Sequence, residues 1–168
     1  MKVFKEEQRF AQTWLILILT FSNLLIVGIM LNEFTKENSS LNIETLIITI
    51  SLILLFTTPI FFFKLITKID EKGIHYQFFP LQWKLKLIQW NEINSAYVRN
   101  YDPIGEYGGW GLKGGALWRK SKGKAINVSG DIGIQLELKN GKKLLIGTQL
   151  KTDAENVLKT YKQKLNYE

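Results

Sequence analysis

One run of residues limits more than any other what this chain can fold into: Leu46–Phe63, LIITISLILLFTTPIFFF, contains no charged side chain. Roughly 20 apolar residues, each rising about 1.5 Å along a helix, cross the ~30 Å hydrocarbon layer of a bilayer. Another charge-free run, Trp14–Leu31, lies nearer the N-terminus. In chain order, Trp14–Leu31 is the first run and Leu46–Phe63 the second. The two runs predict a transmembrane helical hairpin, with helices at about residues 12–32 and 44–64.

The first run also has to be compared with a secretory signal peptide. Its apolar stretch is longer than the usual signal core, and the LNEFTKE that follows it contains no small-x-small cleavage pattern. We therefore expect an uncleaved helix.

The distribution of Lys and Arg beside the two runs predicts their orientation. Basic residues precede the first run and follow the second: Lys2, Lys5, Arg9, Lys64, Lys68 and Lys72. The connection between the runs contains only Lys36 among three glutamates. By the positive-inside tendency, both termini are cytoplasmic in a multi-pass protein of the cell membrane.

Asn23 lies in the middle of the first run, where an unpaired amide in hydrocarbon is costly. In an antiparallel hairpin it is level with about Leu54, close to Ser51 and Thr57. We expect Asn23, Ser51 and Thr57 to form a helix–helix contact through a hydrogen bond. The alternative is a homodimer held together by Asn23.

The remainder of the chain differs in composition from this anchor. From Lys64 onward there are 18 Lys and Arg against 10 Asp and Glu, which accounts for the net charge of +7. Beside a membrane helix, this balance fits an anionic membrane face or a cytoplasmic location, and we expect no nucleic-acid partner. The chain has no Cys and one His, so we expect no metal and no cofactor. We divide it into a membrane anchor, 1–64, and a cytoplasmic domain, 65–168.

Short apolar runs between turn signals predict an antiparallel β domain in the second part. The expected strands are 65–70, 74–79, 83–88, 95–100, 132–138 and 143–147. Thr152 and Glu155 then form a capping-box pattern, followed by an apolar stripe at helical spacing. The expected fold class is α+β: a β sandwich or partly open barrel capped by a C-terminal helix.

The most unusual stretch is Asp102–Lys124, which combines glycines, tryptophans and basic residues. It lacks the phosphate-loop and dinucleotide patterns, so its glycines indicate bends in curved strands. Its candidates for binding lipid or a partner are Trp110, Lys113, Trp118, Arg119, Lys120, Lys122 and Lys124. We expect them to contact anionic lipid headgroups; a solvated loop and a protein-binding loop are the alternatives.

The sequence offers little that indicates catalysis. His75 falls inside an expected strand, and Asp70 and Glu71 are adjacent, so on a strand they point to opposite faces. Asp102 and Glu106 share a loop, but nothing in their spacing supplies a nucleophile or a metal. We therefore expect no catalytic residue.

Several segments resemble a known group of proteins. They are the W-x-E-I of Trp90–Ile93, the Tyr107–Gly111 segment YGGWG, Ala125–Gly130 and Leu145–Thr148. Together with the hairpin and the terminal helix, they are similar to small, largely uncharacterised bacterial membrane proteins that carry a pleckstrin-homology-like (PH-like) domain after a membrane hairpin. The resemblance implies a fold and a membrane setting, and no reaction.

These observations predict a non-enzymatic binding or scaffolding module at the inner membrane surface. Its ligand would be anionic lipid headgroups or a protein partner. The alternatives are an enzyme that acts on a lipid or envelope precursor and a subunit of a larger membrane complex. A concave site with converging His or carboxylate groups would favour the enzyme, whereas a flat basic rim with exposed Trp would favour binding.

Overall fold

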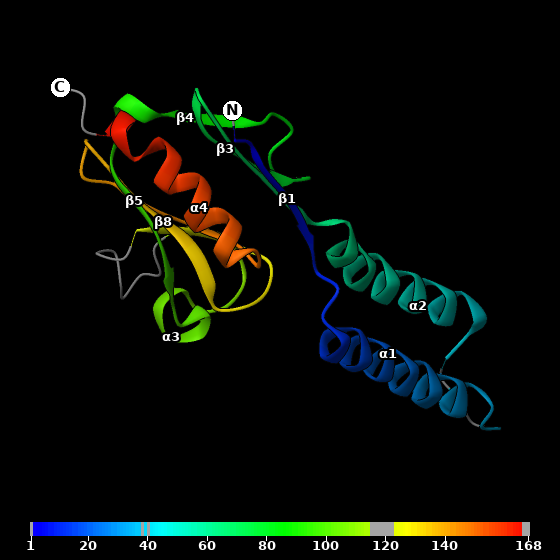
Figure 1. Cartoon of the computed structure of the whole chain (residues 1–168). Coiled ribbons are helices and arrows are strands. Elements are labelled where there is room, and N and C mark those ends of the chain that lie inside the picture. The colour runs from blue at the N-terminus through cyan, green and yellow to red at the C-terminus, as the bar shows by residue number, and fades with distance from the viewer. Residues whose placement is uncertain (1, 38, 40, 115–122, 166–168) are drawn as a thin grey trace. The chain divides into compact units, whose positions relative to one another are not determined.

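The computed structural model describes residues 2–37, 39, 41–114 and 123–165 (Figure 1). The chain divides into two compact units. The helical unit is Phe10–Phe62, and the β unit combines residues 1–9 with Phe63–Glu168.

The helical unit consists of α1, Thr13–Phe34, and α2, Ile43–Thr57, which η1, Thr58–Phe62, extends as a 3-10 turn. Asn42 caps α2 by accepting the amide of Thr45 at 2.8 Å. Thr13–Phe34 and Ile43–Phe62 are long and apolar enough to cross a membrane, with mean hydropathies of 2.4 and 2.3. Both bury almost none of their apolar windows inside the structure, unlike the core helix of a soluble protein.

The two helices are joined by a polar contact. The side-chain amide of Asn23 donates a hydrogen bond to the Thr57 hydroxyl at 3.2 Å. Thr57 in turn donates to the carbonyl of Ile53 at 2.8 Å, whereas Ser51 is exposed. The bond from Asn23 therefore lies within one chain and goes to Thr57 rather than to Ser51.

The first sheet of the β unit is antiparallel, with strands in the order β1-β2-β3-β4 (Figure 1). Its strands are β1 Phe4–Arg9, β2 Lys64–Asp70, β3 Gly73–Phe79 and β4 Lys86–Gln89. β1 precedes α1 along the chain, and β2 follows η1. The register pairs Phe4 with Ile69 and Arg9 with Lys64.

Strand β1 departs from the expected division, which assigned residues 1–64 to the anchor. Its inward-facing side chains are Phe4, Glu6 and Gln8, all of them buried. The Glu6 carboxylate accepts hydrogen bonds from the Thr148 hydroxyl at 2.6 Å and the Gln149 amide at 2.8 Å. Because two of the three buried side chains are polar, the alternating apolar pattern that signals a strand is missing here.

Strand β4 begins three residues later than the expected strand 83–88. The side chain of Gln77 donates to the carbonyls of Gln82 and Trp83, at 3.1 and 3.0 Å. The side chain of Gln82 accepts from the Phe78 amide at 3.2 Å. These bonds hold residues 80–85 in a loop, so the ladder with β3 starts at Lys86.

The second sheet has five strands in the order β5-β8-β9-β7-β6. They are β5 Ile93–Asn100, β6 Gly111–Gly114, β7 Lys124–Asn127, β8 Ile132–Leu138 and β9 Lys143–Gly147. The 3-10 turn η2, Trp90–Glu92, leads into β5, and the short helix α3, Pro103–Tyr107, precedes β6. β7 and β9 are parallel, whereas we expected antiparallel strands throughout. The chain reverses direction between β7 and β8 and again at the turn between β8 and β9, and β9 lies between the other two, so it runs parallel to β7.

Helix α4, Lys151–Tyr161, packs against β1, β5 and β8 and continues as the 3-10 turn η4, Lys162–Leu165 (Figure 1). It buries Ala154, Val157, Leu158 and Tyr161, as the apolar stripe predicts. The Tyr161 ring stacks on Trp90 with centroids 5.2 Å apart, and its hydroxyl donates to the Lys2 carbonyl at 2.7 Å. The expected capping box at Thr152 and Glu155 is wrong, because α4 begins at Lys151. The residue before it, Leu150, donates its amide to the Thr148 hydroxyl at 3.2 Å.

Candidate functional site

The structure describes three of the seven predicted binding residues: Trp110, Lys113 and Lys124. Trp118, Arg119, Lys120 and Lys122 lie outside the described residues. In the β6–β7 pair, Gly111 is opposite Asn127 and Gly114 is opposite Lys124. Trp110 therefore precedes one end of this pair and Lys124 lies at the other, whereas Lys113, opposite Ala125, is next to Lys124.

Trp110 has an internal partner. Its indole N–H donates to the carbonyl of Gly130 at 3.0 Å, in the connection between β7 and β8. The Gly111 amide, next to it, donates to the Asn127 side chain at 2.9 Å. These bonds give Trp110 a structural role at the start of β6.

The glycines between Asp102 and Gly111 lie in and just after the short helix α3, whereas the sequence predicted bends in curved strands. Asp102 caps α3 by accepting the amides of Ile104 and Gly105, at 3.0 and 2.9 Å. Gly108 ends the helix with φ of +73°, a conformation that glycine adopts without steric cost. Glu106 pairs with Arg99 through two bonds, at 2.8 and 3.0 Å. The two carboxylates thus hold the turn in place.

His75 and Asp70 form a second polar cluster. His75 Nε2 lies 3.1 Å from Asp70 Oδ1, and Lys68 Nζ lies 2.9 Å from Asp70 Oδ2. Burial alone would raise the pKa of Asp70, but hydrogen bonds from Lys68, the Lys72 amide and His75 outweigh it and hold that pKa well below 3.8. The network stabilises the β2–β3 turn.

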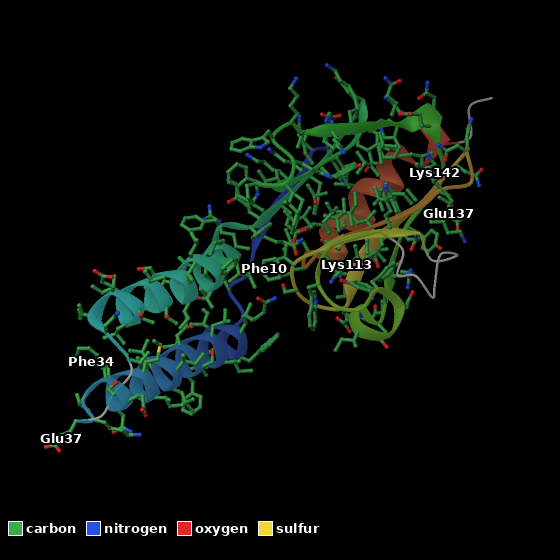
Figure 2. The ribbon with its side chains drawn as sticks, turned by 180° about the vertical axis from the view of Figure 1, so that it is seen from behind. Phe10, Phe34, Glu37, Lys113, Glu137 and Lys142 are labelled. Atoms are coloured by element: carbon green, nitrogen blue, oxygen red, sulfur yellow. The ribbon has the colours of Figure 1, made fainter. Side chains whose placement is uncertain are left out.

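A larger feature is a groove of about 630 Å³ between the two sheets, which we call the lysine groove. The first sheet contributes Tyr76 and Ile88, and the second contributes side chains of β7, β8 and β9. The described residues that line it are Tyr76, Ile88, Gly114, Gly123, Lys124, Leu138, Gly141, Lys142, Lys143 and Leu144. Figure 2 shows Lys142 and Glu137 at the β8–β9 end of the unit.

The groove combines apolar surface with positive charge. Ile88, Leu138 and Leu144 are apolar, whereas Lys124 and Lys142 carry exposed ammonium groups. Lys143 pairs with Glu137, on the neighbouring strand, at 3.3 Å. Burial raises the pKa of Tyr76. Its phenol, which is protonated at neutral pH as in any tyrosine, is available as a hydrogen-bond donor.

Main-chain packing brings the lysines together. β7 and β9 run parallel, and Lys124 lies opposite Leu144 in the register, beside Lys143 and Lys142. Gly123, with φ of +79°, permits this approach, because a Cβ there would lie 2.3 Å from the Lys143 carbonyl oxygen. Sequence reasoning identified Lys124 but missed Tyr76, Lys142 and Lys143. The sequence predicts a turn between the expected strands 132–138 and 143–147, but nothing local indicates that this turn faces Lys124.

Comparison of the chain with protein-family models, curated proteins and solved structures found no match. Lysine ammonium groups and a phenol beside apolar side chains suit an anion attached to an apolar body. The described lining holds no imidazole or carboxylate that would transfer protons.

Proposed function

We propose that this protein is an integral membrane protein whose β unit is a PH-like binding module. In this proposal α1 and α2 span the cell membrane, both termini are cytoplasmic, and the lysine groove binds the anionic headgroup of a phospholipid. The observation that carries the proposal is the groove, with its lysines at the junction of two sheets and its apolar lining.

Membrane insertion is supported by the exposed apolar surface of the helical unit. Phe21 and Phe56 are 68% and 80% exposed, which suits contact with lipid. The pairing of β1 with β2 supports the placement of both ends of the helical hairpin on the same side of the membrane, since the strands of one sheet lie on one side. It also disfavours a cleaved signal peptide, because cleavage after α1 would remove β1 from its sheet.

The PH-like assignment is supported by two sheets followed by a helix that packs on both. The parallel pair β7–β9 and the added strand β6 are departures from a simple antiparallel arrangement. They form one wall of the lysine groove. The proposed ligand site therefore depends on the part of the fold that is least expected.

Charge complementarity favours an anionic lipid as the ligand. A Lys near an anionic membrane surface contributes about 1 kcal/mol of binding free energy. Lys124 and Lys142 together would then contribute about 2 kcal/mol, which corresponds to roughly 30-fold in affinity. The short connections between the units, three residues from Arg9 to Thr13 and one from Phe62 to Lys64, keep the module close to the bilayer.

The proposal is tested with the full chain in phosphatidylcholine nanodiscs, titrated calorimetrically with dihexanoyl phosphatidic acid. We expect binding by the natural protein and about 30-fold weaker binding by the double variant K124Q/K142Q. The matched control is K159Q/K162Q, which removes two exposed lysines from the α4–η4 surface. Equal affinities of the two double variants, or no binding by the natural protein, would refute the lysine groove as the site.

A further inference from the structure

The loop between β3 and β4, residues 80–85, exposes large apolar side chains. Trp83 is 78% exposed, Leu81 60% and Leu85 44%. Among the described residues of the β unit, Trp83 is the most exposed large apolar side chain. Large exposed apolar side chains gathered in one loop indicate an interaction surface.

The exposure is built into the conformation of the loop. Gln77 binds the carbonyls of Gln82 and Trp83, and the Gln82 amide donates to the Phe78 carbonyl at 2.8 Å. The Phe79 ring contacts the Trp83 ring edge-on, with centroids 5.3 Å apart. These contacts hold the loop in a defined conformation in which Trp83 points outward.

The charges around these apolar side chains are positive. Lys84 and Lys86 are exposed and alternate with Trp83, Leu85 and Leu87. Lys64 lies opposite Phe79 in the register, and its ammonium group is 5.8 Å from the centre of the Phe79 ring. Residues 80–87 contain no acidic side chain.

The place of this loop in the chain indicates what covers it. Lys64 begins β2, and only Phe63 separates it from Phe62, where the second candidate membrane span ends. Because Lys64 pairs with Phe79, the base of the loop is next to the point where the chain leaves that span. Trp and Lys are also the residues that favour the headgroup level of an anionic bilayer.

We propose that the β3–β4 loop inserts Leu81 and Trp83 into the interfacial layer of the membrane, while Lys84 and Lys86 contact anionic headgroups. This inference rests on the membrane-spanning part of the proposed function, but it concerns a different surface from the lysine groove. The loop would supplement the hairpin by fixing how the β unit faces the bilayer.

The test uses the absence of cysteine from the chain. Leu81→Cys and, as a control, Ile104→Cys on α3 each introduce one labelling site; Ile104 is 68% exposed. Each full-length variant is labelled with the fluorophore NBD and reconstituted in vesicles of phosphatidylcholine and phosphatidylglycerol. We expect a blue-shifted emission at position 81, with at least twofold stronger quenching by nitroxide-labelled lipid than at position 104. Equal quenching at both positions would overturn the inference.

Two further measurements separate this inference from the proposed function. Replacing Lys84 and Lys86 by Gln is expected to lower the quenching at position 81 in anionic vesicles and to leave it unchanged in pure phosphatidylcholine. Extraction with alkaline carbonate tests the hairpin independently. Retention in the membrane without quenching at position 81 would overturn the loop alone, whereas release of the protein would overturn the membrane spans and the loop together.

Discussion

Replacing Glu6 by Ala tests whether the segment before α1 is part of the β unit. The Glu6 carboxylate is 7% exposed and accepts hydrogen bonds from Thr148 and Gln149, which lie 142 and 143 residues further along the chain. Hydrogen bonds to a charged group contribute about 1.5–3 kcal/mol each to stability, and a buried amide left without a partner adds a desolvation cost. We therefore expect E6A to lower the free energy of unfolding of the β unit by about 3 kcal/mol or more.

The matched control is Glu7→Ala, one residue further along β1. Glu7 faces outward, with its side chain 37% exposed, and pairs with Arg9 at 2.8 Å and Lys64 at 3.7 Å. Exposed ion pairs contribute about 0.2–1 kcal/mol, so E7A should change stability by less than about 1 kcal/mol.

The assay is thermal unfolding of the full chain in detergent micelles, followed by the near-ultraviolet circular dichroism of its aromatic side chains. For a unit of this size, the expected loss in E6A corresponds to a melting temperature lower by roughly 10 °C or more. E7A should melt within a few degrees of the natural protein. If the two variants melted at the same temperature, β1 would not be an integral strand of the sheet, and our account of Glu6 would be refuted.

Three further predictions follow from the structure. Folding lowers the pKa of Asp70, so the stability that its carboxylate contributes is present above the unfolded pKa near 4 and is lost as the pH falls below that value. The melting temperature of D70N should therefore decline less between pH 5 and pH 3 than that of the natural protein. Gly73→Ala places a Cβ 2.1 Å from a backbone oxygen at a residue with φ of +151°, whereas at Gly141 φ is +77° and the surrounding space is open. Gly73→Ala should therefore lower the free energy of unfolding by at least about 2 kcal/mol more than Gly141→Ala, as measured by urea unfolding. Asn23→Leu should cost about 0.6 kcal/mol and leave the cross-linking pattern in membranes unchanged, because its bond lies within one chain; a lost dimer band would contradict this.

Four strands could be located closely from the sequence, because short apolar runs end at turn signals, whereas β1, β6 and β7 were not expected. The expected strands 65–70, 74–79, 132–138 and 143–147 agree with β2, β3, β8 and β9 to within one residue. Both apolar helices were also located, because their length and lack of charge are local properties. The predicted start of β4 was wrong, because the side chains of Gln77 and Gln82 form hydrogen bonds with backbone groups that would otherwise pair in a strand.

The candidate site was harder to predict than the fold. Lys124 was identified from the local density of basic residues, but its neighbours Lys142 and Tyr76 come from a distant turn and from the other sheet. What brings Lys124 and Lys142 together is the parallel pairing of β7 with β9, and a parallel pair leaves no signal in either strand alone. Trp83 was predicted to lie on a strand, so its exposure in a loop was not foreseen.

The position of β1 ahead of the hairpin also has a consequence for biosynthesis. β1 leaves the ribosome before both apolar helices, and its partner β2 follows only after them. Contacts of this N-terminal segment with the end of the chain form later still, because Lys2, just before β1, accepts a hydrogen bond from Tyr161, 159 residues further along. In the proposed membrane protein, a nascent chain therefore holds an unpaired strand while the hairpin inserts, and the β unit closes only when α4 has been synthesised. If the hairpin inserts as proposed, insertion precedes completion of the fold, because helices whose outer ends lay on opposite sides of the bilayer would keep β1 and β2 apart.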